Sequence, residues 1–291
     1  MSRARASHSA AALALLLNAF VWGVSWWPFR ALQGAGLHPL WATCLIYAVA
    51  TLVIVLWRPR SAAQLLRAPS LWLLVLASGA TNAAFNWGVT IGDVVRVVLL
   101  FYLMPLWAVL LARLLLGESV RALALVRVAL ALLGAAVVLR PAGGGWPVPH
   151  TLAEWLGVAG GFAFALNNVL LRREADQPDA ARALAMFVGG ALVAGLLALA
   201  LGVDGVVPAL PAAAPLWMAG TFGMGLAFLG ANLALQYGAA RLPANVTAVV
   251  MITEVVFAST SSVLLGASAL TAALAVGGTL IVGAALLAAR G

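Results

Sequence analysis

One acidic residue, Glu254, lies near the middle of an apolar stretch that runs from residue 244 to 265. If this stretch crosses a membrane, a carboxylate at that depth is costly unless it is paired, hydrated or protonated. Helical spacing places Thr247, Met251 and Ser261 near the same stripe as Glu254. We therefore predict that Glu254 faces an internal cavity and binds a substrate or a proton. The alternative is a protonated carboxyl that holds neighbouring helices together.

Two pairs of amide side chains share a four-residue spacing. Asn82 and Asn86 form the first pair, and Asn232 and Gln236 form the second. Residues four apart lie on one face of a helix, so each pair predicts a two-amide stripe. A shift of 150 positions places the first pair on the second. Such amides bind a polar headgroup or join helix to helix, and the sequence favours neither interpretation over the other.

Three further positions are candidates for contact with a ligand. Tyr102 lies in an aromatic stretch just before Pro105. The proline leaves one backbone carbonyl of the helix without its hydrogen bond, which either serves a function or is a kink that the helix tolerates. Trp22 approaches one end of the first apolar stretch, where an interfacial aromatic belt is favoured over stacking on a substrate. One of Asn167 and Asn168 is expected to face inward, and Asn168 is our candidate.

The elements that must position these residues are membrane-spanning helices. Hydrophobic residues make up 65% of the chain, charged residues only 8%, and the mean hydropathy is +1.09. A water-soluble domain needs more charge to cover its surface. The long apolar blocks favour helices over barrel strands. We predict an all-α membrane protein with ten spans, at residues 10–30, 38–57, 71–90, 93–116, 122–139, 152–171, 181–201, 212–237, 244–265 and 268–289.

Arginine residues predict the direction of the spans. The chain has no lysine, and cytoplasmic loops of membrane proteins are enriched in positive charge. With both termini cytoplasmic, the outside ends carry only Arg30, Arg96 and Arg140. The inside ends then carry Arg3, Arg5, Arg58, Arg60, Arg67, Arg121, Arg172, Arg173, Arg182, Arg241 and Arg290. We expect a multi-pass protein of the cell inner membrane, with both termini in the cytoplasm.

The chain also repeats itself. A shift of 149 positions places Gly117 on Gly266 and residues 134–136 on 283–285, with identical residues in each case. The predicted halves, 1–145 and 146–291, have five spans each. Because five is an odd number, the second half enters the membrane upside down relative to the first. Inverted repeats around a central cavity are a common architecture of secondary transporters.

With ten spans, two five-helix repeats and a motif from Pro105 to Glu118 that ends in Leu-Leu-Leu-Gly-Glu, the chain resembles the EamA branch of the drug/metabolite transporter superfamily. The resemblance implies a cavity lined by the first, third, fourth, sixth, eighth and ninth spans. It also implies export or exchange of amino acids, related metabolites and toxic compounds. The chain departs from the family pattern at Gly266-Ala267, where Gly-Glu is common, and at Glu254, where proline is frequent.

These observations favour a secondary transporter that exports or exchanges small amphipathic metabolites, with amino acids as the leading class, by alternating access. A lipid flippase or scramblase and an exporter of toxic drug-like compounds are the alternatives. We do not expect an enzyme, because a single acid deep within a span has no histidine partner. We expect no cofactor, metal or nucleic acid. The expected partners are a small-molecule substrate, membrane lipid and a coupling proton, and the expected state is a monomer or weak dimer.

Overall fold

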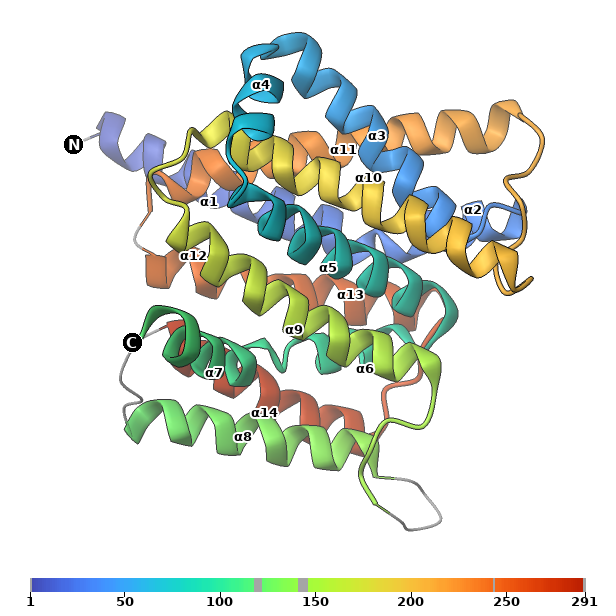
Figure 1. The fold of residues 1–291 in the computed structure, drawn as a ribbon. Coiled ribbons are helices and arrows are strands. Elements are labelled where there is room, and N and C mark those ends of the chain that lie inside the picture. Colours follow the sequence, from blue (N-terminus) through green and yellow to red (C-terminus); the bar gives the residue numbers. More distant parts are fainter. Residues whose placement is uncertain (1, 118–121, 141–145, 243, 290–291) are drawn as a thin grey trace.

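The computed structural model describes residues 2–117, 122–140, 146–242 and 244–289, and these residues form helices without any strand (Figure 1). The first half contains α1 (Ser2–Val24), α2 (Trp26–Gly34), α3 (Pro39–Trp57), α4 (Arg60–Arg67), α5 (Leu71–Ile91), α6 (Val94–Phe101), α7 (Met104–Leu116) and α8 (Ala122–Leu139). The second half contains α9 (Leu152–Arg173), α10 (Asp179–Val203), α11 (Pro215–Ala239), α12 (Ala244–Met251), α13 (Thr253–Leu264) and α14 (Ala272–Ala289). Glu118, Arg121 and Arg290, which support the family resemblance and the orientation, lie outside the described residues.

The all-helical prediction is confirmed for the described residues, and each of the ten predicted segments is mostly helical there. In this part of the chain, 7 helices are long and apolar enough to cross a membrane, or up to 8 when the bent pair of α4 and α5 counts as one span. The remaining apolar helices, Val249–Leu264 and Ala272–Leu287, are shorter. The ten-span count and the inverted repeat therefore remain predictions.

Local sequence signals explain several helix ends. The side chain of Asp93 accepts a hydrogen bond from the backbone N–H of Arg96 (2.8 Å) and caps α6. Thr151 and Glu154 form a reciprocal capping box at the start of α9, which satisfies two backbone N–H groups that the helix leaves unpaired. Gly117 ends α7 in the left-handed conformation (φ +69°), which glycine adopts without steric cost.

Three of the long apolar segments contain a short break in the helix: α1 gives way to α2 at Ser25, and the other two breaks are related by sequence position. α6 gives way to α7 at Tyr102 and Leu103, and α12 gives way to α13 at Ile252. Leu103 and Ile252 are 149 positions apart, the same offset that relates the two left-handed glycines Gly117 and Gly266. Each predicted half therefore has a broken helix at the same place in its sequence, followed by a helix end of the same geometry.

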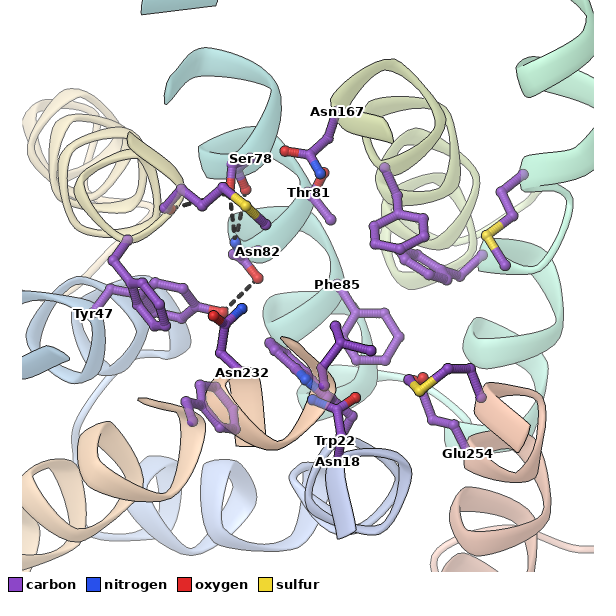
Figure 2. Close-up of a pocket in the computed structure, with 18 of the residues that line it drawn as sticks. Asn18, Trp22, Tyr47, Ser78, Thr81, Asn82, Phe85, Asn167, Asn232 and Glu254 are labelled. Carbon is purple, nitrogen blue, oxygen red and sulfur yellow. Dashed lines mark hydrogen bonds between the residues drawn. The ribbon is translucent and has the colours of Figure 1, made fainter. Parts of the chain in front are cut away.

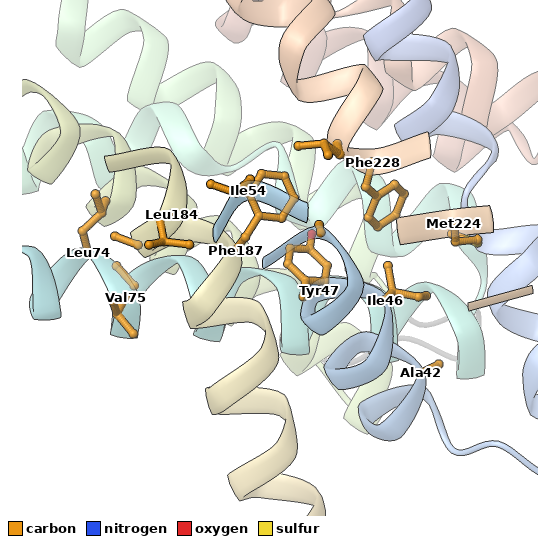
Figure 3. Packing of buried hydrophobic residues seen from close by; sticks show 14 of the residues in the cluster. Ala42, Ile46, Tyr47, Ile54, Leu74, Val75, Leu184, Phe187, Met224 and Phe228 are labelled. Carbon is orange, nitrogen blue, oxygen red and sulfur yellow. The ribbon is translucent and has the colours of Figure 1, made fainter. Parts of the chain in front are cut away.

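Small residues let the helices approach closely. α5 packs against both α9 and α10, α10 packs on α3, and α8 packs on α14. A Cβ atom added at Gly134 of α8 would lie 2.7 Å from the carbonyl oxygen of Gly277 on α14. Such glycine contacts are typical of membrane helices, which associate through close packing because lipid supplies no hydrophobic drive. Larger side chains from α3, α5, α10 and α11 form a buried cluster, including Tyr47, Phe187 and Phe228 (Figure 3).

Candidate functional site

A cavity of about 280 Å³ lies among the helices, next to the two related helix breaks. Figure 2 shows side chains converging on it from helices of both halves. It is lined by Asn18, Trp22, Tyr47, Ser78, Thr81, Asn82, Phe85, Phe101, Tyr102, Met104, Phe164, Asn167, Met186, Phe187, Phe228, Asn232, Leu235, Met251 and Glu254. This volume accommodates a small molecule of metabolite size.

The wall of the cavity is largely aromatic. Eight aromatic side chains line it, and Trp22 stacks on Phe228 with ring centroids 4.4 Å apart. Among the described residues that line the cavity, Glu254 is the one acid, and none is an arginine, lysine or histidine. The chemistry of the wall is therefore a broad apolar surface with amide and hydroxyl groups and one carboxyl group.

Glu254 is the second residue of α13, directly after the break at Ile252. Its Oε2 lies 3.4 Å from the hydroxyl of Tyr102, which donates toward it from the break between α6 and α7. The same hydroxyl lies 3.5 Å from the backbone carbonyl oxygen of Met251, the residue 149 positions after Tyr102. The two breaks thus meet at the carboxyl group. A position in the first turn of a helix favours a negative charge.

The amide side chains lie on a second part of the wall. Asn82 accepts a hydrogen bond from the hydroxyl of Tyr47 and donates to the backbone carbonyl oxygen of Ser78 (2.8 Å). The side chain of Asn232 accepts a hydrogen bond from Gln236 (2.7 Å) (Figure 2 shows Asn82, Tyr47 and Asn232). Asn82 and Asn232, the first residues of the two amide pairs, both line the cavity.

The structure brings together five of the eight predicted site residues: Glu254, Asn82, Asn232, Tyr102 and Trp22. The other three do not line the cavity. Asn86 is buried and donates to the hydroxyl of Thr43 (3.2 Å), and Gln236 is exposed and reaches the wall only through Asn232. Asn168 is exposed, while its neighbour Asn167 is buried and lines the cavity.

Sequence reasoning missed most of the aromatic wall and also Asn18. Aromatic residues are common in apolar helices, so their types alone do not reveal which of them share a cavity. Asn18 could have been found, because it lies 149 positions before Asn167, the offset that relates the two glycines. An asparagine inside an apolar span is also a functional candidate by its polarity alone.

A second set of polar groups lies at the start of α6 and α9. Arg96 forms an ion pair with Glu154 (2.8 Å), which also accepts from the backbone N–H groups of His150 and Thr151 (2.7 and 3.2 Å). Asp93 accepts from the backbone N–H of Arg96, whereas the side chain of Arg96 pairs with Glu154. Within the described residues, no group of three or more histidine, cysteine or acidic side chains is placed to hold a metal.

The described residues form long apolar helices around a cavity, as a multi-pass membrane protein does, and a comparison with known families adds to this. Residues 9–140 match the model of the EamA-like transporter family, which confirms the resemblance seen in the sequence. The matched segment covers nearly all of the first predicted half, and the members of that family are transporters of the drug/metabolite transporter superfamily.

The similar solved structures support the fold alone. One crystal structure of a protein shares 22% sequence identity with the chain and covers 96% of each chain, with a TM-score of 0.58. No curated protein matches the sequence significantly.

Proposed function

We propose that this protein is a secondary transporter of the inner membrane that exports or exchanges small amphipathic metabolites, with amino acids as the first class to test. One observation carries this proposal: an aromatic cavity of about 280 Å³ contains one carboxyl group and several amide groups. A substrate with an apolar part and a cationic end fits such a wall. The apolar part contacts the rings, and the ammonium group lies against Glu254.

An amino acid also carries a carboxylate, which needs donors. The wall offers no basic side chain for it among the described lining residues, but it does offer the amide groups of Asn82, Asn167 and Asn232. The amide nitrogen of Asn232 is suited to this role, because its oxygen already accepts a bond from Gln236.

The lack of a basic group also favours a second candidate class. An amphipathic amine, such as a drug-like cation, has no carboxylate and therefore needs no basic side chain from the wall of the cavity. Amines and amino acids of the same side chain are therefore the most informative pair of substrates to compare.

Alternating access is the transport mechanism that we propose. The two broken helices lie at repeat-related positions and meet at the cavity, as expected if the halves exchange conformations around a central site. Glu254 supplies a means of coupling. Ionised, it needs water or a cation beside it; protonated, it tolerates closure of the cavity around it. A proton that leaves when the substrate ammonium binds would couple the two fluxes.

The test is transport by purified protein in proteoliposomes, with a pH gradient and labelled L-phenylalanine or phenethylamine. Glu254→Gln keeps the shape of the side chain but removes its charge, and we expect it to abolish flux driven by pH while the protein remains folded. Asp204→Asn, a change of an exposed acid after α10, is the matched control and should leave flux unchanged. Wild-type pH dependence in Glu254→Gln would mean that the carboxyl is structural. Lipid scrambling without solute flux would favour a scramblase instead.

The amides give a separate test of the same cavity. Asn82→Ala and Asn232→Ala should each weaken uptake while the folded protein is retained, because both side chains line the cavity. Measured uptake equal to that of the wild type in both variants would contradict a role in binding.

A further inference from the structure

Two buried asparagines in the cavity wall each have an oxygen atom that lacks a partner. Asn18 on α1 is 1% exposed, and Asn167 on α9 is 2% exposed. Neither Oδ1 has a hydrogen-bond partner among the described residues. The two residues are 149 positions apart, so the same group recurs at the same place in both predicted halves. Figure 2 shows both side chains among those that surround the cavity.

The identity of the free atom in Asn18 follows from its other contact. Its amide nitrogen donates to the backbone carbonyl oxygen of Ala231 at 2.7 Å. A carbonyl oxygen only accepts, so the atom that faces it must be the NH₂ group. The unpaired atom is therefore the oxygen, and it offers an acceptor. Reversing the amide would place two oxygen atoms against each other.

Most buried polar atoms in proteins have partners, so each exception needs an explanation. A few other described residues, such as Thr51 on α3, also contain a buried unpaired atom. Among that group, Asn18 and Asn167 are the members that line the cavity. Their position beside a space of ligand size points to a ligand as the missing donor.

We propose that Asn18 and Asn167 are acceptors for N–H groups of the substrate, and that they select a primary ammonium group over a quaternary one. This inference rests on the proposed transport function and specifies its substrate chemistry. The proposal requires each amide to turn so that its buried oxygen faces a substrate in the cavity that the residue lines. The two asparagines then supply acceptors from opposite halves of the chain.

The selection follows from the number of N–H groups on the substrate. A primary ammonium has three N–H donors, which is enough for the Glu254 carboxylate and for an asparagine oxygen. A quaternary ammonium carries the same charge but has no N–H donor. The charge of Glu254 attracts both cations, whereas the asparagine oxygens satisfy their missing bond only with the primary one. A site built around hydrogen bonds rejects a ligand that leaves its buried polar groups unpaired.

Binding of two matched probes to the purified, full-length protein tests this. The probes are phenethylamine and its N,N,N-trimethyl analogue, and the readout is quenching of tryptophan fluorescence, since Trp22 lines the cavity. We expect phenethylamine to bind about tenfold or more tightly, which is the effect of one hydrogen bond to a charged group. Asn18→Ala and Asn167→Ala should each reduce this ratio while binding of the trimethyl probe changes little.

Thr51→Val is the matched control. It removes a buried, unpaired side-chain oxygen that does not line the cavity, and it should preserve the wild-type ratio. Equal affinity for the two probes, or a ratio unchanged in both asparagine variants, would overturn the inference and leave the transport proposal standing. Selective binding of phenethylamine without any flux in proteoliposomes would instead refute transport and retain the role of the asparagines. Failure of both probes to bind would contradict the inference directly.

Discussion

Replacing Glu154 should destabilise the protein more than replacing any exposed acid of similar chemistry. The Glu154 side chain is 7% exposed and ties together three groups at the start of α9. It pairs with Arg96 of α6 across a distance of 2.8 Å, and it accepts hydrogen bonds from the backbone N–H groups of His150 and Thr151. The change Glu154→Ala removes all three interactions at once.

The size of the effect follows from these contacts. Loss of the capping interaction costs about 1 kcal/mol. A fully buried ion pair would add about 3–5 kcal/mol when one partner is removed, but the Arg96 side chain is 38% exposed and water can solvate it, so we assign about 1 kcal/mol. The sum is about 2 kcal/mol, which corresponds to a melting temperature lower by about 4–8 °C in a chain of this size. Glu154→Gln keeps an acceptor for the backbone and should show about half of this loss.

Asp179→Ala is the matched control for Glu154→Ala. Asp179 also lies in the first turn of a long helix and also pairs with an arginine, Arg182, but its side chain is 87% exposed. An exposed pair within one helix contributes about 0.5 kcal/mol or less. Thermal unfolding in detergent, followed by circular dichroism, measures both variants. Equal shifts for Glu154→Ala and Asp179→Ala would show that burial and capping do not set the effect, and the reasoning would be wrong.

Two further variants test pH dependence and packing. The side chain of His38 accepts a hydrogen bond from the backbone N–H of Leu40 and caps α3. Burial lowers the pKa of His38 below its ordinary value of 6.5. The unfolded chain therefore binds the proton more readily than the folded protein, and stability is lost as pH falls below about 6.5. The melting temperature of His38→Asn, which keeps a capping side chain, should fall less than that of the wild type between about pH 8 and pH 5.5. Gly134→Ala should destabilise the protein by about 1–3 kcal/mol in the same melts, because the added Cβ atom would meet the backbone of Gly277. Gly283 lies at the repeat-related position with open space around it, so Gly283→Ala should be neutral or stabilising. Equal effects of the two changes would contradict the packing argument.

The helical class could be predicted from the sequence because it depends on composition and on the lengths of apolar stretches. Those signals are local, and each of the ten predicted segments is mostly helical where the structure describes it. The breaks were harder to predict. Pro105 indicated a kink, and the helix restarts at Met104, directly before it. Nothing so clear marks the break at Ile252, which sequence reasoning reaches only through the 149-residue offset from Leu103.

The candidate site was predictable where polarity conflicts with the apolar surroundings. Glu254, Asn82 and Asn232 stood out for this reason, and all three line the cavity. The choice between Asn167 and Asn168 could not be made in this way, because adjacent residues on a helix point about 100° apart and the rotation of the helix depends on its packing. That packing is visible only in three dimensions, where α9 lies against α5 and α6.

The two predicted halves share a framework, but they contribute different chemistry to the cavity. At the helix breaks, Tyr102 corresponds to Met251, and Pro105 corresponds to Glu254. One half therefore supplies a hydroxyl group and the other a carboxyl group, and these groups meet at 3.4 Å. Asn18 and Asn167, in contrast, are the same residue in both halves. A substrate whose cationic end pairs with Glu254 has a fixed orientation in the cavity, because no second carboxyl lines it among the described residues. The asparagines can accept its N–H groups from either half. In the alternating access that we propose, this combination would let the two halves exchange conformations while the substrate keeps one polar anchor.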